Sequence, residues 1–114
     1  MQELFDLFEE FGYPYYRQGS LASTDYPDDA FFTFWNYDTP ILRYRDNGSK
    51  DYSINVMVYF YTNNAFLLYD VMSNFIIQAK EKGFIVEGKS YDTPSDRNDY
   101  FGRLVSIKII RKED

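Results

Sequence analysis

Apolar residues recur at helical spacing in two stretches of this chain and alternate with polar residues in several others, a pattern typical of a mixed domain of helices and strands. The first stretch lies within residues 1–12. As a helix it would be apolar on one side and acidic on the other, and Gly12 at its end is a stop signal. We therefore expect a short amphipathic helix at the N-terminus. Its apolar side consists of Leu4, Leu7, Phe8 and Phe11.

The second helical stretch, residues 64–83, predicts the main helix. Thr62, Asn63 and Asn64 precede it and can cap free N–H groups, while Lys80 and Gly83 suit its C-terminal end. We expect its buried stripe to contain Leu68, Val71, Met72, Phe75, Ile76 and Ala79. Both ends of this helix are thus specified by local sequence.

Residues 30–61 predict strands and a hairpin. AFFTFWNY at 30–37 is strongly β-prone, and ILRYR at 41–45 and YSINVMVYFY at 52–61 flank a turn signal at Asn47 and Gly48. In the longer strand, the even-numbered residues from Tyr52 to Phe60 form the expected core face. Its odd-numbered residues are polar near the start and aromatic near the end, which fits a face that is wet at one end and covered at the other.

Residues 84–110 predict two further strands, at 84–88 and 101–110, separated by a polar, turn-rich segment at 89–100. Residues 13–29 contain two prolines and show no period, so they read as a loop whose tyrosine-rich start is packed. The chain as a whole, residues 1–114, predicts a single α+β domain. We expect one mostly antiparallel or mixed β-sheet packed against one long helix, with a short N-terminal helix.

The amino-acid composition excludes several kinds of catalytic and metal site. The chain has no Cys and no His, so it cannot build a histidine general base, a cysteine nucleophile or a Cys/His zinc site. Loop carboxylates occur at Asp28 and Asp29 and again at Asp92, Asp96 and Asp99, but neither grouping has the spacing of a known motif. Turn and cap roles account for them better than acid–base or calcium chemistry. We therefore expect no catalytic residue, no metal and no cofactor.

The net charge and the hydropathy of the chain argue against two classes of partner, nucleic acids and membranes. The net charge is −6, which disfavours binding to phosphate backbones, so no nucleic-acid specificity is expected. No apolar run approaches membrane-spanning length, and the acidic N-terminus lacks the features of a signal peptide, so no membrane association is expected either.

The aromatic content is the feature left to explain, with 12 Tyr, 11 Phe and one Trp. Aromatic residues occupy consecutive positions of the strand at 31–37, so they point to both faces of the sheet. The N-terminal helix and the YPYY loop can cover the outer set, or a neighbouring subunit can do so; stacking on a sugar is a third reading. The basic hairpin residues can meet acidic segments of another copy. The candidate subunit-interface residues are Phe31, Trp35, Tyr37, Arg43 and Arg45.

A family resemblance makes this reading specific. The chain resembles small phage and prophage tail-terminator or tail-completion proteins in two phrases and in the order of its elements. The phrases are DDAFFTFWNYDTP and KEKGFIVEGKSYDTPSD; a long strand ending in YFYT and a helix lie between them, and a final strand follows. The similarity runs from about residue 4 to residue 110. That family implies an α+β fold, no enzyme activity, and assembly as a ring, often a hexamer, that caps the tail tube and joins it to the head.

The resemblance implies a non-enzymatic structural protein whose partners are further copies of itself, tail-tube proteins and head-completion proteins. It also implies a location in the tail or neck of the virion, with the host bacterial cytoplasm as the place of assembly. A small aromatic-rich binding or host-interaction module is the alternative, and a carboxylate-dependent hydrolase comes third. A ring would distinguish the first reading, a pocket lined by Trp35 and tyrosines the second, and two buried neighbouring carboxyls the third.

Overall fold

A computed structural model describes residues 2–18, 29–44, 48–95 and 97–113. The described chain is α+β, with a single mixed sheet of six strands and two helices, and the sheet dominates the molecule. The long helix expected from the sequence is present but spans only 17 residues, so it covers part of the sheet. Neither helix of the described chain is long and apolar enough to span a membrane.

The two helices begin and end close to the predicted positions. Helix α1 spans Gln2–Phe11 and helix α2 spans Ala65–Glu81. Asn64 caps α2, because its side chain accepts a hydrogen bond from the backbone N–H of Phe66 at 3.0 Å. Gly83 follows α2 with a positive φ of 93°, a conformation that glycine adopts at no steric cost.

The six strands lie in the order β1-β2-β4-β6-β5, and β3 pairs with part of β4. Their bounds are Tyr15–Arg17 for β1, Ala30–Asp38 for β2, Ile41–Tyr44 for β3, Lys50–Thr62 for β4, Ile85–Thr93 for β5 and Phe101–Glu113 for β6. All pairs are antiparallel except β1 with β2. Since β6 is antiparallel to both β4 and β5, these two strands run parallel with β6 between them. The expected hairpin of β3 and β4 is confirmed, although residues 45–47 of its turn lie outside the described residues.

Three segments differ from the sequence-based expectation. Residues 15–17, expected to be loop, form β1 and pair in parallel with β2. The polar segment at 89–100 is strand as far as Thr93, because a register shift after Glu87, where Gly88 has a φ of 72°, lets β5 resume its pairing with β6. Strand β6 also continues three residues past 110, to Glu113.

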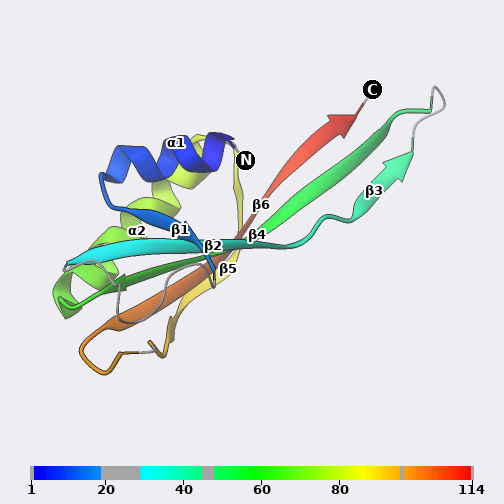
Figure 1. Cartoon of the computed structure of the whole chain (residues 1–114). Coiled ribbons are helices and arrows are strands. Elements are labelled where there is room, and N and C mark those ends of the chain that lie inside the picture. The colour runs from blue at the N-terminus through cyan, green and yellow to red at the C-terminus, as the bar shows by residue number, and fades with distance from the viewer. Residues whose placement is uncertain (1, 19–28, 45–47, 96, 114) are drawn as a thin grey trace.

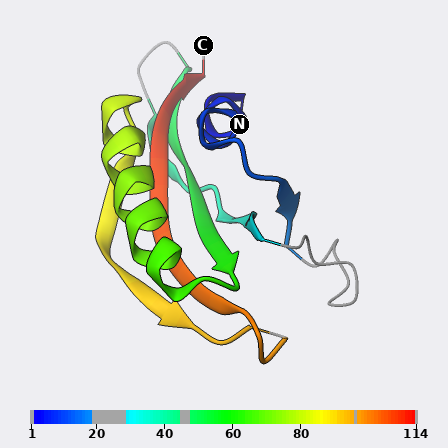
Figure 2. The same cartoon turned by 90° about the vertical axis from the view of Figure 1, so that its left-hand side faces the viewer.

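One face of the sheet carries the main core, and both helices lie on it. Phe8 of α1 lies 5.8 Å from Phe75 of α2 and 4.8 Å from Phe32 of β2, measured between ring centroids. Helix α1 therefore packs over β1 and β2, while α2 packs over β4, β6 and β5 (Figure 2). This corrects part of one sequence-based reading, that the N-terminal helix and the YPYY loop cover the outer aromatic residues of β2. The helix joins the main core instead, whereas Tyr16 of the YPYY segment does pack against Phe31.

The sheet extends beyond its helices as a projecting arm, which we define as β3 with residues 50–53 of β4 and residues 110–113 of β6. Strand β5 pairs with β6 only as far as Lys108, so the arm has three strands (Figure 1). With this projection the molecule is 53 Å long and 26 Å wide. An ion pair between Arg111 and Glu3 ties the base of the arm to α1.

Candidate subunit interface

The sheet face opposite the helices, which we call the open face, is built by the alternation of side chains along three adjacent strands. Cross-strand neighbours bring Trp35, Met57 and Ser106 into one row, and Thr33, Tyr59 and Leu104 into the next. The residues of the open face are Thr33, Trp35 and Tyr37 of β2, Met57 and Tyr59 of β4, and Leu104 and Ser106 of β6. Most of these side chains combine an apolar body with a polar group.

Trp35 and Tyr37 are the most accessible aromatic residues of this face. Their exposed fractions are 43% and 37%, and both belong to the part of β2 that extends past the end of its pairing with β1. Their rings lie 5.9 Å apart, and the hydroxyl groups of Tyr37 and Ser106 are hydrogen bonded at 2.9 Å across β4. The two rings are therefore held in place before any partner binds, which lowers the entropy that binding would cost.

Phe31, the third aromatic candidate, is buried within the single chain. Its exposed fraction is 1%, because Tyr61 of β4 and Tyr100 pack against it with ring centroids 5.3 and 6.1 Å away. Tyr16 of β1 also approaches this small second core, at 6.2 Å from Phe31. The structure thus separates Phe31 from Trp35 and Tyr37, which the sequence had grouped together.

The basic candidates belong to the hairpin. Arg43 lies in β3, where its backbone pairs opposite Asp51 of β4, while Arg45 lies outside the described residues. The arm also presents apolar side chains, since Ile41, Leu42 and Ile110 are each about half exposed. The described side chains of the arm therefore include a partly exposed apolar surface.

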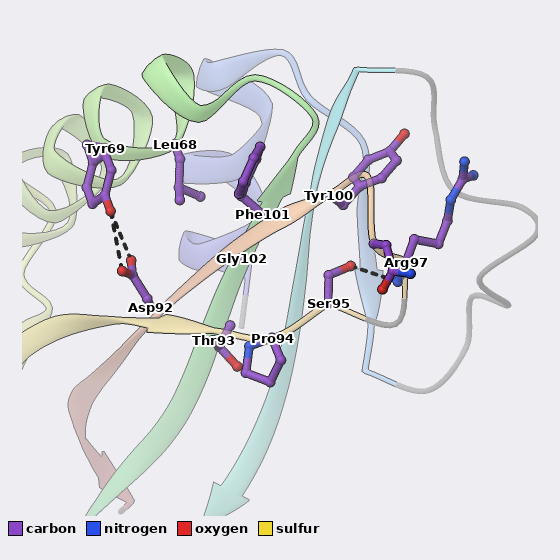
Figure 3. Close-up of a pocket in the computed structure, with 11 residues that line it drawn as sticks. Leu68, Tyr69, Asp92, Thr93, Pro94, Ser95, Arg97, Tyr100, Phe101 and Gly102 are labelled. Carbon is purple, nitrogen blue, oxygen red and sulfur yellow. Dashed lines mark hydrogen bonds between the residues drawn. The ribbon is translucent and has the colours of Figure 1, made fainter.

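A groove lies at the end of the molecule farthest from the arm. It has a volume of about 390 Å³ and lies between the first turns of α2 and the connection from β5 to β6 (Figure 3). Leu68 and Tyr69 approach it from α2, and Phe101 approaches it from β6. Sequence reasoning missed this groove, because its walls come from segments about 30 residues apart whose proximity depends on the tertiary fold.

Arg103 holds one wall of this groove together. Its guanidinium donates to Asp92 Oδ1 at 2.6 Å, to Ser90 Oγ at 2.8 Å and to the Ser90 carbonyl oxygen at 3.1 Å. The Tyr69 ring lies over the same guanidinium at 4.8 Å, and the Tyr69 hydroxyl donates to Asp92 at 3.3 Å. This network links Tyr69 of α2 to Asp92 near the end of β5, and both of these residues line the groove.

Two of the loop carboxylates, Asp92 and Asp99, have structural partners. Asp92 binds Arg103, and Asp99 accepts two hydrogen bonds from Arg97 at 2.7 and 3.0 Å. Both carboxylates are more than half exposed. Asp28 and Asp96 lie outside the described residues. Across the described ranges, no three acidic side chains gather where they could hold a metal ion.

Two contacts of α1 perturb ionisable groups. The Tyr15 hydroxyl donates to Glu9 Oε1 at 2.9 Å, and this hydrogen bond raises the pKa of the phenol above its usual value. Lys82 lies 2.9 Å from Glu10 Oε1, and its hydrogen bond to that carboxylate raises the pKa of the ammonium group. Both contacts fasten α1 to the rest of the molecule.

The open face and the groove are separate features. Trp35 lies on the open face and does not line the groove, which is bordered instead by Tyr69 and Tyr100. Neither a family model nor a curated protein matches this chain. The functional argument therefore rests on the geometry of the open face, the arm and the groove, together with the resemblance noted in the sequence.

Proposed function

We propose that this chain is a non-enzymatic tail protein of a phage or prophage, a tail terminator or tail-completion component that acts as a homo-oligomeric ring at the head–tail junction. The observation that carries the proposal is the open face, where Trp35 and Tyr37 are held in place yet exposed on the part of β2 that extends past β1. Trp and Tyr are enriched at interface centres because each supplies a large rigid surface and a polar group.

The resemblance to tail-terminator proteins supports a ring over a simple pair of subunits. A ring requires two different complementary surfaces on each copy, because every contact is head to tail. This chain has candidates for such surfaces on the open face around Trp35 and on the projecting arm. Subunits that bury these surfaces against one another would present one end of the ring to the tail tube and stop its polymerisation.

The groove beside Tyr69 also favours a second candidate function, a small binding or host-interaction module. Its volume of about 390 Å³ falls within the range of small-molecule sites. However, the side chains at its wall bind one another, as Arg103 and Asp92 do, and are not directed at a common ligand position. The ring-forming structural protein therefore remains the better proposal.

Tail-tube capping tests this proposal directly. Tubes purified from the phage or prophage that encodes the chain are mixed with the protein, and the mass of the protein and its position on the tubes are recorded across concentrations. We expect rings at tube ends, and we expect Trp35→Ala to abolish capping while the monomer stays folded. A protein that stays monomeric at every concentration and leaves tube ends bare would refute the proposal.

A further inference from the structure

We propose that Asn36 is a positioning residue that sets the direction of the arm, because its side chain pins the bend at which β2 passes into β3 (Figure 1). Strands β4 and β6 run from the body of the sheet into the arm as one regular ladder, which pairs all 13 residues of β4 with residues of β6. The third strand of the arm does not continue the body in this way. This inference concerns the free chain, so it stands apart from the proposed assembly.

Two irregularities separate β3, the edge strand of the arm, from β2. The register of β2 on β4 shifts just after Asn36, and the register of β3 on β4 shifts just after Ile41. Such bulges bend a strand and increase its local twist. Of the described strands, only β4 and β6 cross from the body into the arm as a regular ladder, and two-stranded ribbons are the sheets that twist most. The direction of the arm therefore depends on the contacts that hold the bend.

The amide of Asn36 supplies such contacts. In the orientation that its neighbours select, its Nδ2 lies 2.9 Å from the carbonyl oxygen of Asp38 and 2.9 Å from that of Asn55, and it donates to both. Its Oδ1 accepts a hydrogen bond from Thr39 Oγ1 at 3.0 Å. Asn55 belongs to β4, whereas Asp38 ends β2 and Thr39 follows it. The amide thus joins the bend to the central strand of the arm, with side-chain donors where the regular backbone pairing is interrupted.

A second contact holds the opposite edge of the arm. Arg111 of β6 pairs with Glu3 of α1, and both side chains are about one-third exposed. Salt screens an exposed ion pair of this kind, whereas hydrogen bonds from an uncharged amide to backbone carbonyl groups carry no net charge to screen. The hydrogen bonds of Asn36 should therefore hold the arm at low and at high ionic strength, and salt separates the two contacts.

Distances between two spin labels test this inference, because the chain has no native cysteine that would also be labelled. One label is attached to the arm at Leu42→Cys and the other to α2 at Ile77→Cys, two side chains that are about half exposed. Labelled protein is diluted in unlabelled protein, so that double electron–electron resonance measures distances within one chain. We expect a narrow distribution of arm-to-body distances with Asn36 and a wider, shifted distribution with Asn36→Leu, at low and at high salt.

Two controls separate the arm from the body. Asn74→Leu makes the same change at an exposed asparagine of α2 and should leave the arm-to-body distribution as it is in the native chain. A label pair inside the body, Ile77→Cys with Phe101→Cys, should give one distribution for Asn36 and for Asn36→Leu. If this body pair also widens, the substitution disturbs the whole sheet, and the assignment of Asn36 to the arm is wrong.

A second variant tests the donors of the amide alone. Asn36→Asp keeps an acceptor for Thr39 but loses both donors, so it should widen the arm-to-body distribution as Asn36→Leu does. Amide exchange at Ser53, whose N–H donates to the Pro40 carbonyl oxygen at 3.1 Å beyond the bend, should become faster in both variants. A distribution as narrow as that of the native chain in either variant, or a widening seen only at high salt, would overturn the inference.

Discussion

The two faces of the sheet use aromatic residues in opposite ways, although the same strands supply both. On the face under the helices, Phe8, Phe32, Phe60 and Phe75 are fully buried and interlock with one another. On the open face, the same strands present Trp35, Tyr37 and Tyr59, side chains with an N–H or O–H group. In β2 and β4 every phenylalanine is buried, whereas Trp35 and Tyr37, whose polar groups can meet water or a partner, are partly exposed.

This difference separates stability from association within one strand. Along β2, Phe32 faces the core, and three residues later Trp35 faces outward. A substitution at the first position should therefore change folding, and a substitution at the second should change binding. The predictions below test this separation, beginning with the largest effect.

The largest loss of stability is expected for Phe32→Ala. Phe32 is fully buried and contacts the rings of Phe8, Phe60 and Phe75, so truncation leaves a cavity and should lower the free energy of unfolding by about 3–5 kcal/mol. Trp35→Ala on the same strand should cost about 1 kcal/mol or less, because Trp35 is partly exposed. Urea unfolding of both variants measures these values. Equal losses at the two positions would show that the open face is part of the folding core.

A smaller loss of stability is expected for Gly102→Ala, which tests the end of the open face where Tyr61 and Phe31 are buried. A Cβ at this position would lie 2.7 Å from Tyr61 Cε1 and 2.8 Å from the Thr93 carbonyl oxygen, and the backbone atom cannot move away easily. We expect a loss of about 1–3 kcal/mol and a disturbed contact between Tyr61 and Phe31. Ser106→Ala, on the same strand and face, is the control and should cost less. Near-UV circular dichroism together with urea unfolding checks both variants.

Arg103→Met tests the wall of the groove. The change keeps much of the apolar side chain but removes the hydrogen bonds to Asp92 and Ser90, so we expect a loss of about 1–3 kcal/mol and faster amide exchange in residues 88–93. Lys108→Met on the same strand removes a surface ion pair with Glu87 and should cost about 0.5 kcal/mol or less. Exchange rates at residues 88–93 that are the same in Arg103→Met and in the native chain would mean that the network does not hold β5.

The smallest effect concerns alkaline pH. The pKa values of Tyr15 and Lys82 are raised by Glu9 and Glu10 of α1, so both contacts stabilise the fold below the usual pKa values of 10.0 and 10.5 and are lost as pH rises through the raised values. Relative to a variant with Glu9→Gln and Glu10→Gln, the native chain should therefore lose stability more steeply above about pH 10. Urea unfolding between neutral pH and about pH 11.5 measures the difference, and a constant difference over that range would contradict the assignment.

The sequence predicts those elements whose signals are local. Helix α2 has a capping Asn64, a periodic stripe and a terminal Gly83, and its bounds agree with the prediction within two residues. Strands β2 and β4 have long runs of β-branched and aromatic residues and are confirmed as well. In each case the side chains that define the element lie inside the segment itself.

The features that the sequence did not predict depend on distant contacts. Strand β1 consists of three residues next to Pro14, and it becomes a strand only because β2 lies alongside it. Phe31 looked like a surface residue, yet Tyr100, some 70 positions later, buries it. The groove likewise requires α2 and the end of β5 to meet. Periodicity within a short window carries no information about such pairings.

The central claim, that the exposed part of the open face around Trp35 and Tyr37 is a site of self-association, is tested most directly by sedimentation velocity of the native chain and of Trp35→Ala over a wide range of concentrations. We predict that the native chain forms an oligomer of fixed mass and that Trp35→Ala raises its dissociation constant by about 30-fold, the size expected for an interface hot spot, with little change in the free energy of unfolding. Identical masses for the two proteins at every concentration would contradict the claim.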